Sequence, residues 1–496
     1  MTKFLLPLTF LFISLLAKAQ DVTVPVDTTI VTKHTAIIKG ATIPYTATVG
    51  FQPVWDESGA PIASLLYTYY KRTDIKNDET RPLVISFNGG PGSASVWMHI
   101  AYTGPRILKI DDEGFPVQPY GIKDNPNSIL DVADIVYVNP VNTGYSRMLP
   151  GKDGKMPDKT QFFGVNADIS YLADWVNTFV TRNNRWRSPK FLIGESYGTT
   201  RVSGLALELQ NSKWMYLNGV ILVSPTELGF SFDGPVEVAN RLPYFAAAAW
   251  YHKALPAELQ NRDLSELLPE VEKYAVDELL PALAKGGYLD AAKKEEVIDK
   301  MAYYSGLSKE TIRSNNLEVP FDYFWKDLLR NKDGMTIGRL DSRYKGMDIK
   351  EAGDGPDYNS ELTSWLNSFT PAINYYMSQE LNYKTDLEYN MFGPVRPWDN
   401  TRNSAGADLR EAMAMNPNLH TMVQSGYFDG ACTYFNAKYV MGQINANGKL
   451  GDRLSFKGYR SGHMMYLRAE DLIKANDDIR DFINTASTNI EQGAKY

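Results

Sequence analysis

One pentapeptide, Gly194-Glu195-Ser196-Tyr197-Gly198, constrains the fold of this chain more than any other segment. It follows residues 190–193, a short apolar run with the character of a buried strand. Gly-x-Ser-x-Gly after a strand is typical of a nucleophile elbow, a tight strand-to-helix turn that lifts a serine hydroxyl above a sheet and needs small residues on either side. The same pattern also occurs by chance in surface turns, so its meaning depends on the rest of the chain.

Further apolar runs before and after the pentapeptide predict an α/β fold with a mostly parallel central sheet. Short apolar runs are typical of buried parallel strands. They occur at residues 82–88, 135–139 and 219–224, and the sheet is expected to resume at residues 419–424 and near residues 453–457. Residues 167–181 carry apolar side chains at helical spacing, so strand and helix alternate. Ahead of them, residues 35–70 alternate apolar and polar side chains, which predicts antiparallel strands with turns at Gly40, Gly50 and Gly59.

The composition changes after the run at residues 219–224. Residues 235–331 are rich in Ala, Leu, Lys and Glu, which predicts a series of helices. Asp290 is expected to cap one helix, and Gly286-Gly287 and Gly306 are expected to end others.

Two more elements are expected before the sheet resumes: a strand pair through residues 338–343, entered by a turn at Asp333-Gly334, and helix over residues 358–387. The first credible acid for a catalytic serine lies far beyond Ser196, so we expect the helical stretch to be a cap inserted over the active site of an α/β-hydrolase fold. The predicted division is a signal peptide at residues 1–19, a first core segment at 20–234, a mainly helical cap at 235–400 and a second core segment at 401–496.

The N-terminus has the pattern of a secretory signal peptide. Lys3 precedes an apolar run at residues 4–16, which is followed by Ala17-Lys18-Ala19. This run is shorter than the about 20 apolar residues of a transmembrane helix, and no later segment is long and apolar enough to span a bilayer. We therefore expect an exported protein, periplasmic or secreted, with no membrane partner.

Composition also narrows the choice of partners and cofactors. The formal net charge is −7 with acidic and basic residues interspersed, so we expect small substrates or peptides as partners and no nucleic acid. Cys432 is the single cysteine, which excludes an intrachain disulfide and a thiolate metal centre. The five histidines form no His-Glu-x-x-His, so a zinc hydrolase is disfavoured and we predict no metal and no cofactor.

A catalytic serine needs a base, and the base needs a third group to orient it. His463 lies in a loop of small residues after the last predicted strand, where the histidine of this fold belongs. Of the other histidines, two precede the serine, one lies in the cap and one lies in a strand. Asp429 follows the strand at residues 419–424 and is the preferred acid. Asp408 and Asp452 are alternatives, but neither directly follows an apolar strand.

A glycine-rich segment, Asn-Gly-Gly-Pro-Gly-Ser at residues 88–93, directly follows the strand at residues 82–88. Consecutive glycines let the backbone approach a substrate closely and point amides at it, so an oxyanion hole is the functional interpretation. A phosphate-binding loop is the competing interpretation. It is disfavoured because no Lys-Ser or Lys-Thr pair follows the glycines.

Together these segments resemble the serine carboxypeptidases. The matching motifs are Phe-Asn-Gly-Gly-Pro-Gly at residues 87–92, Asn-Pro-Val-Asn-Thr-Gly-Tyr-Ser at 139–146, Gly-Glu-Ser-Tyr-Gly at 194–198, Gly-x-x-Asp at 426–429 and Gly-His-Met at 462–464. They occur in the family's order, and the likeness covers residues 36–468.

The resemblance implies a serine-type carboxypeptidase that releases a C-terminal amino acid from peptides through an acyl-enzyme, without a metal or organic cofactor. Ser196, Asp429 and His463 match the family's triad. The backbone amides of Gly90 and Tyr197 match its oxyanion hole.

Asn88 and Glu195 match the pair that, in this family, hydrogen-bonds the free C-terminal carboxylate of the peptide. This role is physically reasonable for Glu195, because two carboxylates can share a site only if one of them keeps a proton. We therefore expect a raised pKa for Glu195 and better peptide binding at acidic pH. The alternative is that Glu195 only provides a favourable charge at a helix N-terminus.

Some positions depart from the family. Phe87 stands where a tryptophan is usual, Ser93 where a cysteine is common, and Tyr102 where many members have a glutamate that helps to organise the carboxylate site. Segments such as residues 338–343 suggest a distinct, bacterial branch. Cys432 either lies near the pocket for the penultimate side chain of the substrate or has only a packing role.

Two other classes of function stay open. The same fold and triad support esterases and acyltransferases, so an exported serine esterase or acyltransferase is the main alternative. The presence of both Asn88 and Glu195 favours peptide substrates. A catalytically silent binding protein is disfavoured, because every triad and oxyanion position is filled.

Overall fold

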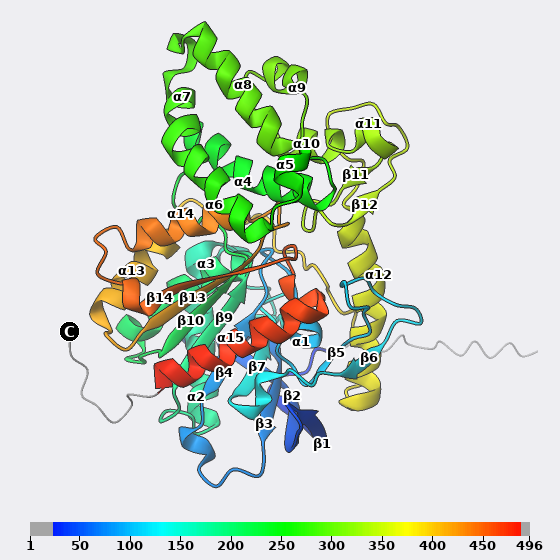
Figure 1. The fold of residues 1–496 in the computed structure, drawn as a ribbon. Coiled ribbons are helices and arrows are strands. Elements are labelled where there is room, and N and C mark those ends of the chain that lie inside the picture. The colour runs from blue at the N-terminus through cyan, green and yellow to red at the C-terminus, as the bar shows by residue number, and fades with distance from the viewer. Residues whose placement is uncertain (1–22, 488–496) are drawn as a thin grey trace, which may run out of the picture.

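The computed structural model describes residues 23–487, and a ten-stranded sheet forms their centre (Figure 1). In spatial order the strands are β1 (Thr28–Ile38), β2 (Ala41–Trp55), β3 (Pro61–Arg72), β7 (Asp134–Val138), β4 (Leu83–Phe87), β9 (Lys190–Glu195), β10 (Gly219–Val223), β13 (His420–Gly426) and β14 (Leu454–Tyr459), with β8 (Arg147–Met148) paired to β3. From β7 to β14, neighbouring strands run parallel. The predicted mostly parallel central sheet is confirmed, and each run expected to be a strand forms one, although β14 at the edge of the sheet is only half-buried along most of its length.

The three N-terminal strands pair antiparallel, as predicted. Gly40 and Gly59 occupy the turns between them with φ values of +81° and +76°, a region that favours glycine. The turn predicted at Gly50 is wrong, because Gly50 lies inside β2 opposite Tyr67 of β3. A Cβ at this position would lie 2.2 Å from the Tyr67 ring, so this glycine makes room for an aromatic side chain.

Helices cover both faces of the sheet, and alternate strand residues enter two separate apolar clusters. In β7, Ile135 and Tyr137 join the cluster that includes side chains of α1 (Val96–Ala101) and α15 (Ala469–Ser487). Val136 and Val138 join the opposite cluster. That second cluster is covered by α2 (Val165–Arg182), α3 (Tyr197–Ser212), α13 (Ala405–Met415) and α14 (Tyr434–Ile444). This layered arrangement is the predicted α/β-hydrolase fold.

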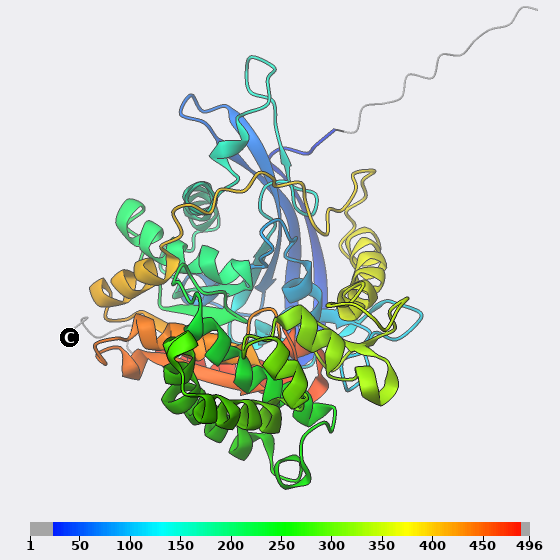
Figure 2. The same cartoon turned by 90° about the horizontal axis from the view of Figure 1, so that it is seen from above.

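The predicted run of helices after β10 is confirmed and gathers above one end of the sheet (Figures 1 and 2). It comprises α4 (Pro235–Tyr251), α5 (Ala257–Gln260), α6 (Leu264–Tyr274), the π-helical turn η4 (Ala275–Leu279), α7 (Leu280–Lys285), the 3-10 turn η5 (Gly286–Tyr288), α8 (Ala291–Ser305), α9 (Lys309–Ser314), α10 (Phe321–Asp327) and α11 (Arg330–Asp333). Asp290 caps α8, since its carboxylate accepts hydrogen bonds from two backbone amides, and Gly306 ends that helix in the left-handed conformation. These helices pack around an apolar cluster of their own.

Two expectations for the segment after these helices need correction. The strand pair is β11 (Thr336–Ile337) with β12 (Lys345–Gly346), and residues 338–343 form the loop between the two strands. Polar contacts fix this loop, which has no strand-to-strand hydrogen bonds of its own. For example, the carboxylate of Glu361 accepts a hydrogen bond from the backbone amide of Leu340 at 2.8 Å. The helix is shorter than predicted, because α12 (Ser360–Tyr375) and the π-helical turn η6 (Tyr376–Glu380) end where Glu380 pairs with Arg106.

The remaining elements are short. They are the hairpin of β5 (Arg106–Leu108) and β6 (Ile122–Asp124), and the 3-10 turns η1 (Asp78–Thr80), η2 (Ile129–Asp131), η3 (Lys159–Gln161), η7 (Gly451–Arg453) and η8 (Met465–Leu467). Trp365 and Phe369 of α12 pack in the sheet's own cluster with α1, so α12 is anchored on the core. The predicted domain division at residues 234/235 and 400/401 stays a prediction.

Between residues 23 and 487, no helix combines the length and hydropathy needed to cross a membrane. The predicted signal peptide at residues 1–19 lies outside the described residues.

A buried ion cluster ties the amino ends of neighbouring strands together, and it allows a test of the fold. Asp134 at the start of β7 is fully buried and accepts hydrogen bonds from Arg81 at 2.9 Å and Arg185 at 2.7 Å. Removing one partner of such a cluster leaves buried charge uncompensated. We expect Asp134→Ala to lower the free energy of unfolding by about 3–5 kcal/mol, measured by urea denaturation.

The control for this change is Asp27→Asn, which removes the charge paired with Arg182 in an exposed ion pair and suits the φ of 54° at this position. Because water screens exposed pairs, this substitution should cost less than about 1 kcal/mol. Equal losses in the two variants would contradict a supporting role for the buried cluster.

Candidate active site

Ser196 lies at the sharp turn between β9 and α3. Its backbone has φ 57° and ψ −129°, a conformation that a serine adopts only under constraint. The amide of Ser196 donates to the carbonyl of Val223 on β10 at 3.0 Å. A Cβ at Gly194 would lie 2.1 Å from the carbonyl oxygen of Gly198, so the two glycines let the chain cross itself. The geometry is that of the predicted nucleophile elbow.

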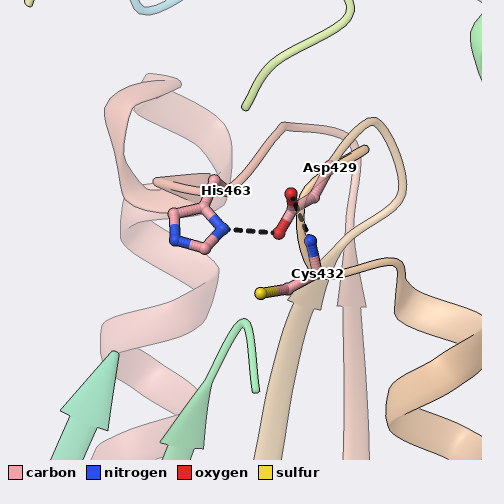
Figure 3. A group of neighbouring side chains, drawn as sticks. All are labelled: Asp429, Cys432 and His463. Carbon is pink, nitrogen blue, oxygen red and sulfur yellow. Dashed lines mark hydrogen bonds and ion pairs between the residues drawn. The ribbon is translucent and has the colours of Figure 1, made fainter. Parts of the chain in front are cut away.

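The predicted base and acid come together from loops after neighbouring parallel strands. His463 follows β14 and Asp429 follows β13, and Nδ1 of the imidazole lies 2.7 Å from Oδ2 of the carboxylate (Figure 3). The second oxygen of Asp429 accepts the backbone amides of Ala431 and Cys432 at 2.8 and 3.0 Å. Both side chains are buried. The carboxylate is thus held rigidly and fixes the orientation of the imidazole ring.

The electrostatics of this pair favour the imidazolium. Burial of His463 disfavours its charged form, but the negative charge and hydrogen bond of Asp429, together with the influence of Cys432, outweigh burial and raise the pKa of His463 well above 6.5. An acid placed in this way stabilises the positive charge that forms when the histidine accepts a proton. Neither Asp408 nor Asp452, the alternative acids, is paired with a histidine in the described residues.

The glycine-rich loop after β4 packs directly on the elbow. A Cβ at Gly89 would lie 2.4 Å from the amide nitrogen of Tyr197 and 2.6 Å from the carbonyl oxygen of Glu195. Tyr197 is the first residue of α3, so its amide has no acceptor within the helix. Gly90 and Tyr197 both line the cavity that contains Ser196. The structure therefore brings the two predicted oxyanion positions to the serine.

Asn88 and Glu195 lie side by side in this cavity. Asn88 is buried, and its Oδ1 accepts the amide of Met98 at 3.1 Å. Its Nδ2 is shielded from solvent and forms no well-aligned hydrogen bond among the described residues, although the side chain lies next to the carboxyl of Glu195 and the hydroxyl of Tyr466. A buried amide donor without an acceptor is costly, and a ligand oxygen in the cavity would satisfy it.

Glu195 is 3% exposed and receives a hydrogen bond from the hydroxyl of Tyr466 on Oε2. Burial raises the pKa of this carboxyl to about 7, against the opposing influence of His463 and Tyr466. The expected rise in the pKa of Glu195 is thus present before any substrate binds. Tyr466 was not predicted from the sequence, although it lies only three residues after His463.

A buried ion pair that was not predicted from the sequence supports the glycine-rich loop after β4. Arg201 on α3 donates to Asp168 on α2 at 2.7 Å and to the carbonyl oxygen of Asn88 at 2.6 Å, and both charged side chains are 1% exposed. Fully buried charges of this kind carry a high desolvation cost and persist only when well paired. They fix the position of Asn88 relative to the elbow. No local pattern in the sequence separates Asp168 and Arg201 from surface charges of their helices.

The cavity has a volume of about 390 Å³ and contains seven of the eight predicted site residues, with Asp429 behind His463. Its apolar walls come from segments that lie far apart in the sequence. They are Trp97, Leu340, Leu362, Trp365, Phe392 and Met464. The side chains of Glu227 and Arg339 add one charge of each sign. None of these wall residues was predicted from the sequence.

Cys432 also lines the cavity, and burial raises the pKa of its thiol. Its sulfur, a nitrogen of His463 and a carboxylate oxygen of Asp429 lie within 4.8 Å of one another (Figure 3). These three residues could in principle ligate a metal ion. However, Asp429 is already engaged by the imidazole and two backbone amides, an arrangement that suits an acid–base pair better than a metal centre.

The fold and the site define an α/β-hydrolase with a serine elbow, and comparison with known proteins places it more closely. Residues 44–458 match the model of the family described as serine carboxypeptidase, and the chain belongs to that family. The structure of Kex1(delta)p, a prohormone-processing carboxypeptidase from Saccharomyces cerevisiae, is similar with a TM-score of 0.51 and 15% sequence identity over 90% of this chain and 92% of that one. At this identity the likeness supports the fold alone.

Curated relatives include serine carboxypeptidase-like 36 of Arabidopsis thaliana, which is 29% identical over 34% of this chain and 32% of the relative. The human retinoid-inducible serine carboxypeptidase is 28% identical over 49% of this chain and 50% of the relative. The chain thus spans from about a third to about half of the length of these relatives.

The contact between the glycine-rich loop and the elbow can be tested with Gly89→Ala. The added Cβ would meet only backbone atoms, which cannot turn aside as a side chain can. The loop and its amides must therefore shift away from Ser196. We expect kcat/KM for any cleaved substrate to fall at least about 100-fold, the usual cost of losing one oxyanion donor.

Gly442→Ala is the control, because a Cβ on that α14 residue meets nothing within 4 Å. It should leave kcat/KM unchanged. Thermal unfolding of both variants separates a local shift from loss of the fold. Full activity in a folded Gly89→Ala variant would show that the close approach is not needed.

Proposed function

We propose that this protein is a serine-type carboxypeptidase that removes one amino acid at a time from the C-terminus of peptides. Ser196 Oγ attacks the carbonyl carbon of the last peptide bond while His463 takes its proton, and Asp429 stabilises the imidazolium. The amides of Gly90 and Tyr197 hold the negative oxygen of the tetrahedral intermediate. His463 then protonates the leaving amine, and a water activated by the same histidine hydrolyses the acyl-enzyme.

The observation that carries the proposal is the pair of groups next to the nucleophile. Asn88 Nδ2 is a buried donor without a well-aligned hydrogen bond in the described residues, and Glu195 beside it is buried with a pKa of about 7. A neutral amide donor and a carboxyl able to keep a proton are what a terminal carboxylate needs at a site of low polarity. An internal peptide bond or a simple ester offers no group that would use both.

Membership of the serine carboxypeptidase family supports peptide substrates with a free C-terminus. We also propose that the protein is exported, on the strength of the charged, apolar and small-residue pattern of residues 3–19. Cys432 is proposed to border the space for the penultimate side chain, because it lines the cavity next to His463.

Peptide end-group dependence tests the activity. A mixed peptide pool with free C-termini and the same pool with amidated C-termini are incubated with the mature protein at pH values from about 5, where a shared proton is available, to about 8, where more of His463 is neutral and can accept a proton. Mass spectrometry should show loss of single C-terminal residues, mainly from free ends.

Ser196→Ala is the control for this experiment and should show no cleavage. Internal cleavage regardless of the end group would refute the role of Asn88 and Glu195. Intact peptides together with hydrolysis of small esters would favour the esterase or acyltransferase alternative.

The pH dependence of KM tests Glu195 separately. A terminal carboxylate, with a pKa of about 3.5, is ionised throughout the range from pH 5 to 9. Glu195 is protonated below about pH 7 and can donate to it, whereas above this pH two negative charges face each other. KM for a free-acid peptide should rise about tenfold per pH unit above pH 7.

Glu195→Gln keeps a neutral donor at every pH, so its KM should stay level across the same range. A wild-type KM that does not change between pH 6 and 9 would contradict the assignment. Because kcat follows the protonation of His463, only KM is used in this comparison.

A further inference from the structure

The hydroxyl of Tyr466 donates a hydrogen bond to the carboxyl of Glu195, and the side chain of Asn88 also lies close enough to influence that carboxyl. Tyr466 lies in the turn η8, three residues after His463, and is 1% exposed. Its O–H donates to Oε2 of Glu195, whereas Oε1 has no such partner in the same part of the chain. The two oxygens of this carboxyl are therefore in different environments.

The ring of Tyr466 is held in place by a second tyrosine. Tyr102 stacks on it with a centroid separation of 4.5 Å and an interplanar angle of 12°. The hydroxyl of Tyr102 donates to Gln424 on β13 at 2.7 Å. Gln424 donates to Tyr459 at 2.9 Å, and Tyr459 donates to Asp478 on α15 at 2.8 Å. A connected set of buried hydrogen bonds anchors the stack to the sheet and to α15.

We propose that Tyr466 is a positioning residue that directs the proton of Glu195 towards the carboxylate of the substrate. When Glu195 binds a proton, Oε2 already accepts the hydroxyl of Tyr466, so the proton occupies Oε1. Glu195 lines the cavity together with Asn88, whose Nδ2 has no well-aligned hydrogen bond in residues 23–487, and a donor on Oε1 completes a two-donor site for a terminal carboxylate. This inference rests on the proposed carboxypeptidase function and specifies how its substrate is recognised.

The groups that face Glu195 set the balance between its two forms. Burial favours the protonated form most strongly, and the negative charge of Asp429 adds to it. His463, the hydrogen bond of Tyr466 and Asn88 favour the ionised form. Because the phenol is neutral, Tyr466 orients the carboxyl without competing for its proton as a second carboxyl would. Loss of its hydroxyl should therefore weaken orientation and also raise the pKa of Glu195 further.

The test measures binding in the Ser196→Ala background, which prevents turnover. The probes are an N-acetylated dipeptide of apolar residues with a free C-terminus and the same dipeptide with a C-terminal amide. Their Kd values are measured by calorimetry from pH 5 to 8, with and without Tyr466→Phe. We expect Tyr466→Phe to weaken binding of the free acid about tenfold at pH 5.5 and to leave the amide unchanged.

The pH at which free-acid binding falls off should move upwards in the same variant, a change that mere loss of packing would not produce. In the active enzyme, Tyr466→Phe should raise KM for free-acid peptides and leave kcat within a factor of about two or three. Tyr102→Phe is the matched control, since it keeps the stacked ring and removes only the bond to Gln424. It should preserve the discrimination between acid and amide.

Unchanged free-acid binding in Tyr466→Phe would overturn the inference while leaving the carboxypeptidase function intact. An equal loss for acid and amide would reduce Tyr466 to a packing residue and would also overturn it. If the Ser196→Ala parent bound the free-acid and the amidated dipeptide equally well, the proposed carboxylate site would be refuted, and the inference about Tyr466 would be refuted with it.

Discussion

The active site depends on one contact between two backbone segments. The loop at residues 88–90 and the elbow at residues 195–198 approach more closely than any Cβ would permit, so glycine occupies the points of contact at Gly89 and Gly198. The contact fixes the position of groups on both segments. It brings two backbone amides to the serine, and it places the side chains that flank those amides next to each other. Nucleophile, amide donors and carboxyl are thus arranged by the same packing event.

A buried ion pair supports this contact. The pair of Asp168 and Arg201 is almost completely shielded from solvent, yet one guanidinium nitrogen is used on the backbone of Asn88. Replacing such a pair with apolar residues is often neutral for stability, so its value here lies in precise placement. A rigid support matters most where a donor has no well-aligned hydrogen bond within the described residues, as is the case for Asn88 Nδ2. If the side chain of Asn88 could rotate, its amide would bond to another acceptor and would no longer be available to a ligand in the cavity.

The sequence predicted those parts of the structure that local chemistry determines. Strand positions, the elbow and the caps at Asp290 and Gly306 follow from apolar runs and from turn chemistry, and the fold class follows from their order. Gly50 was misjudged because glycine can serve a neighbouring ring as well as a turn, and only the pairing with Tyr67 distinguishes the two. The loop at residues 338–343 resembles a strand in composition, but contacts with the distant Glu361 decide its path.

The cavity walls and the stack of Tyr102 on Tyr466 were beyond prediction for a related reason, since each arises from segments that meet only in the folded chain. Tyr102 illustrates the limit best. Many members of the family have a glutamate at this position that helps to organise the carboxylate site. With Tyr102 there, the sequence alone did not show how the proton of Glu195 is held. In the structure the hydroxyl of Tyr102 donates to Gln424, and its ring stacks on Tyr466. The group that donates to Glu195 is instead the neutral hydroxyl of Tyr466. Under the proposed function, the affinity for a terminal carboxylate should therefore follow the titration of the one carboxyl beside Asn88, that of Glu195.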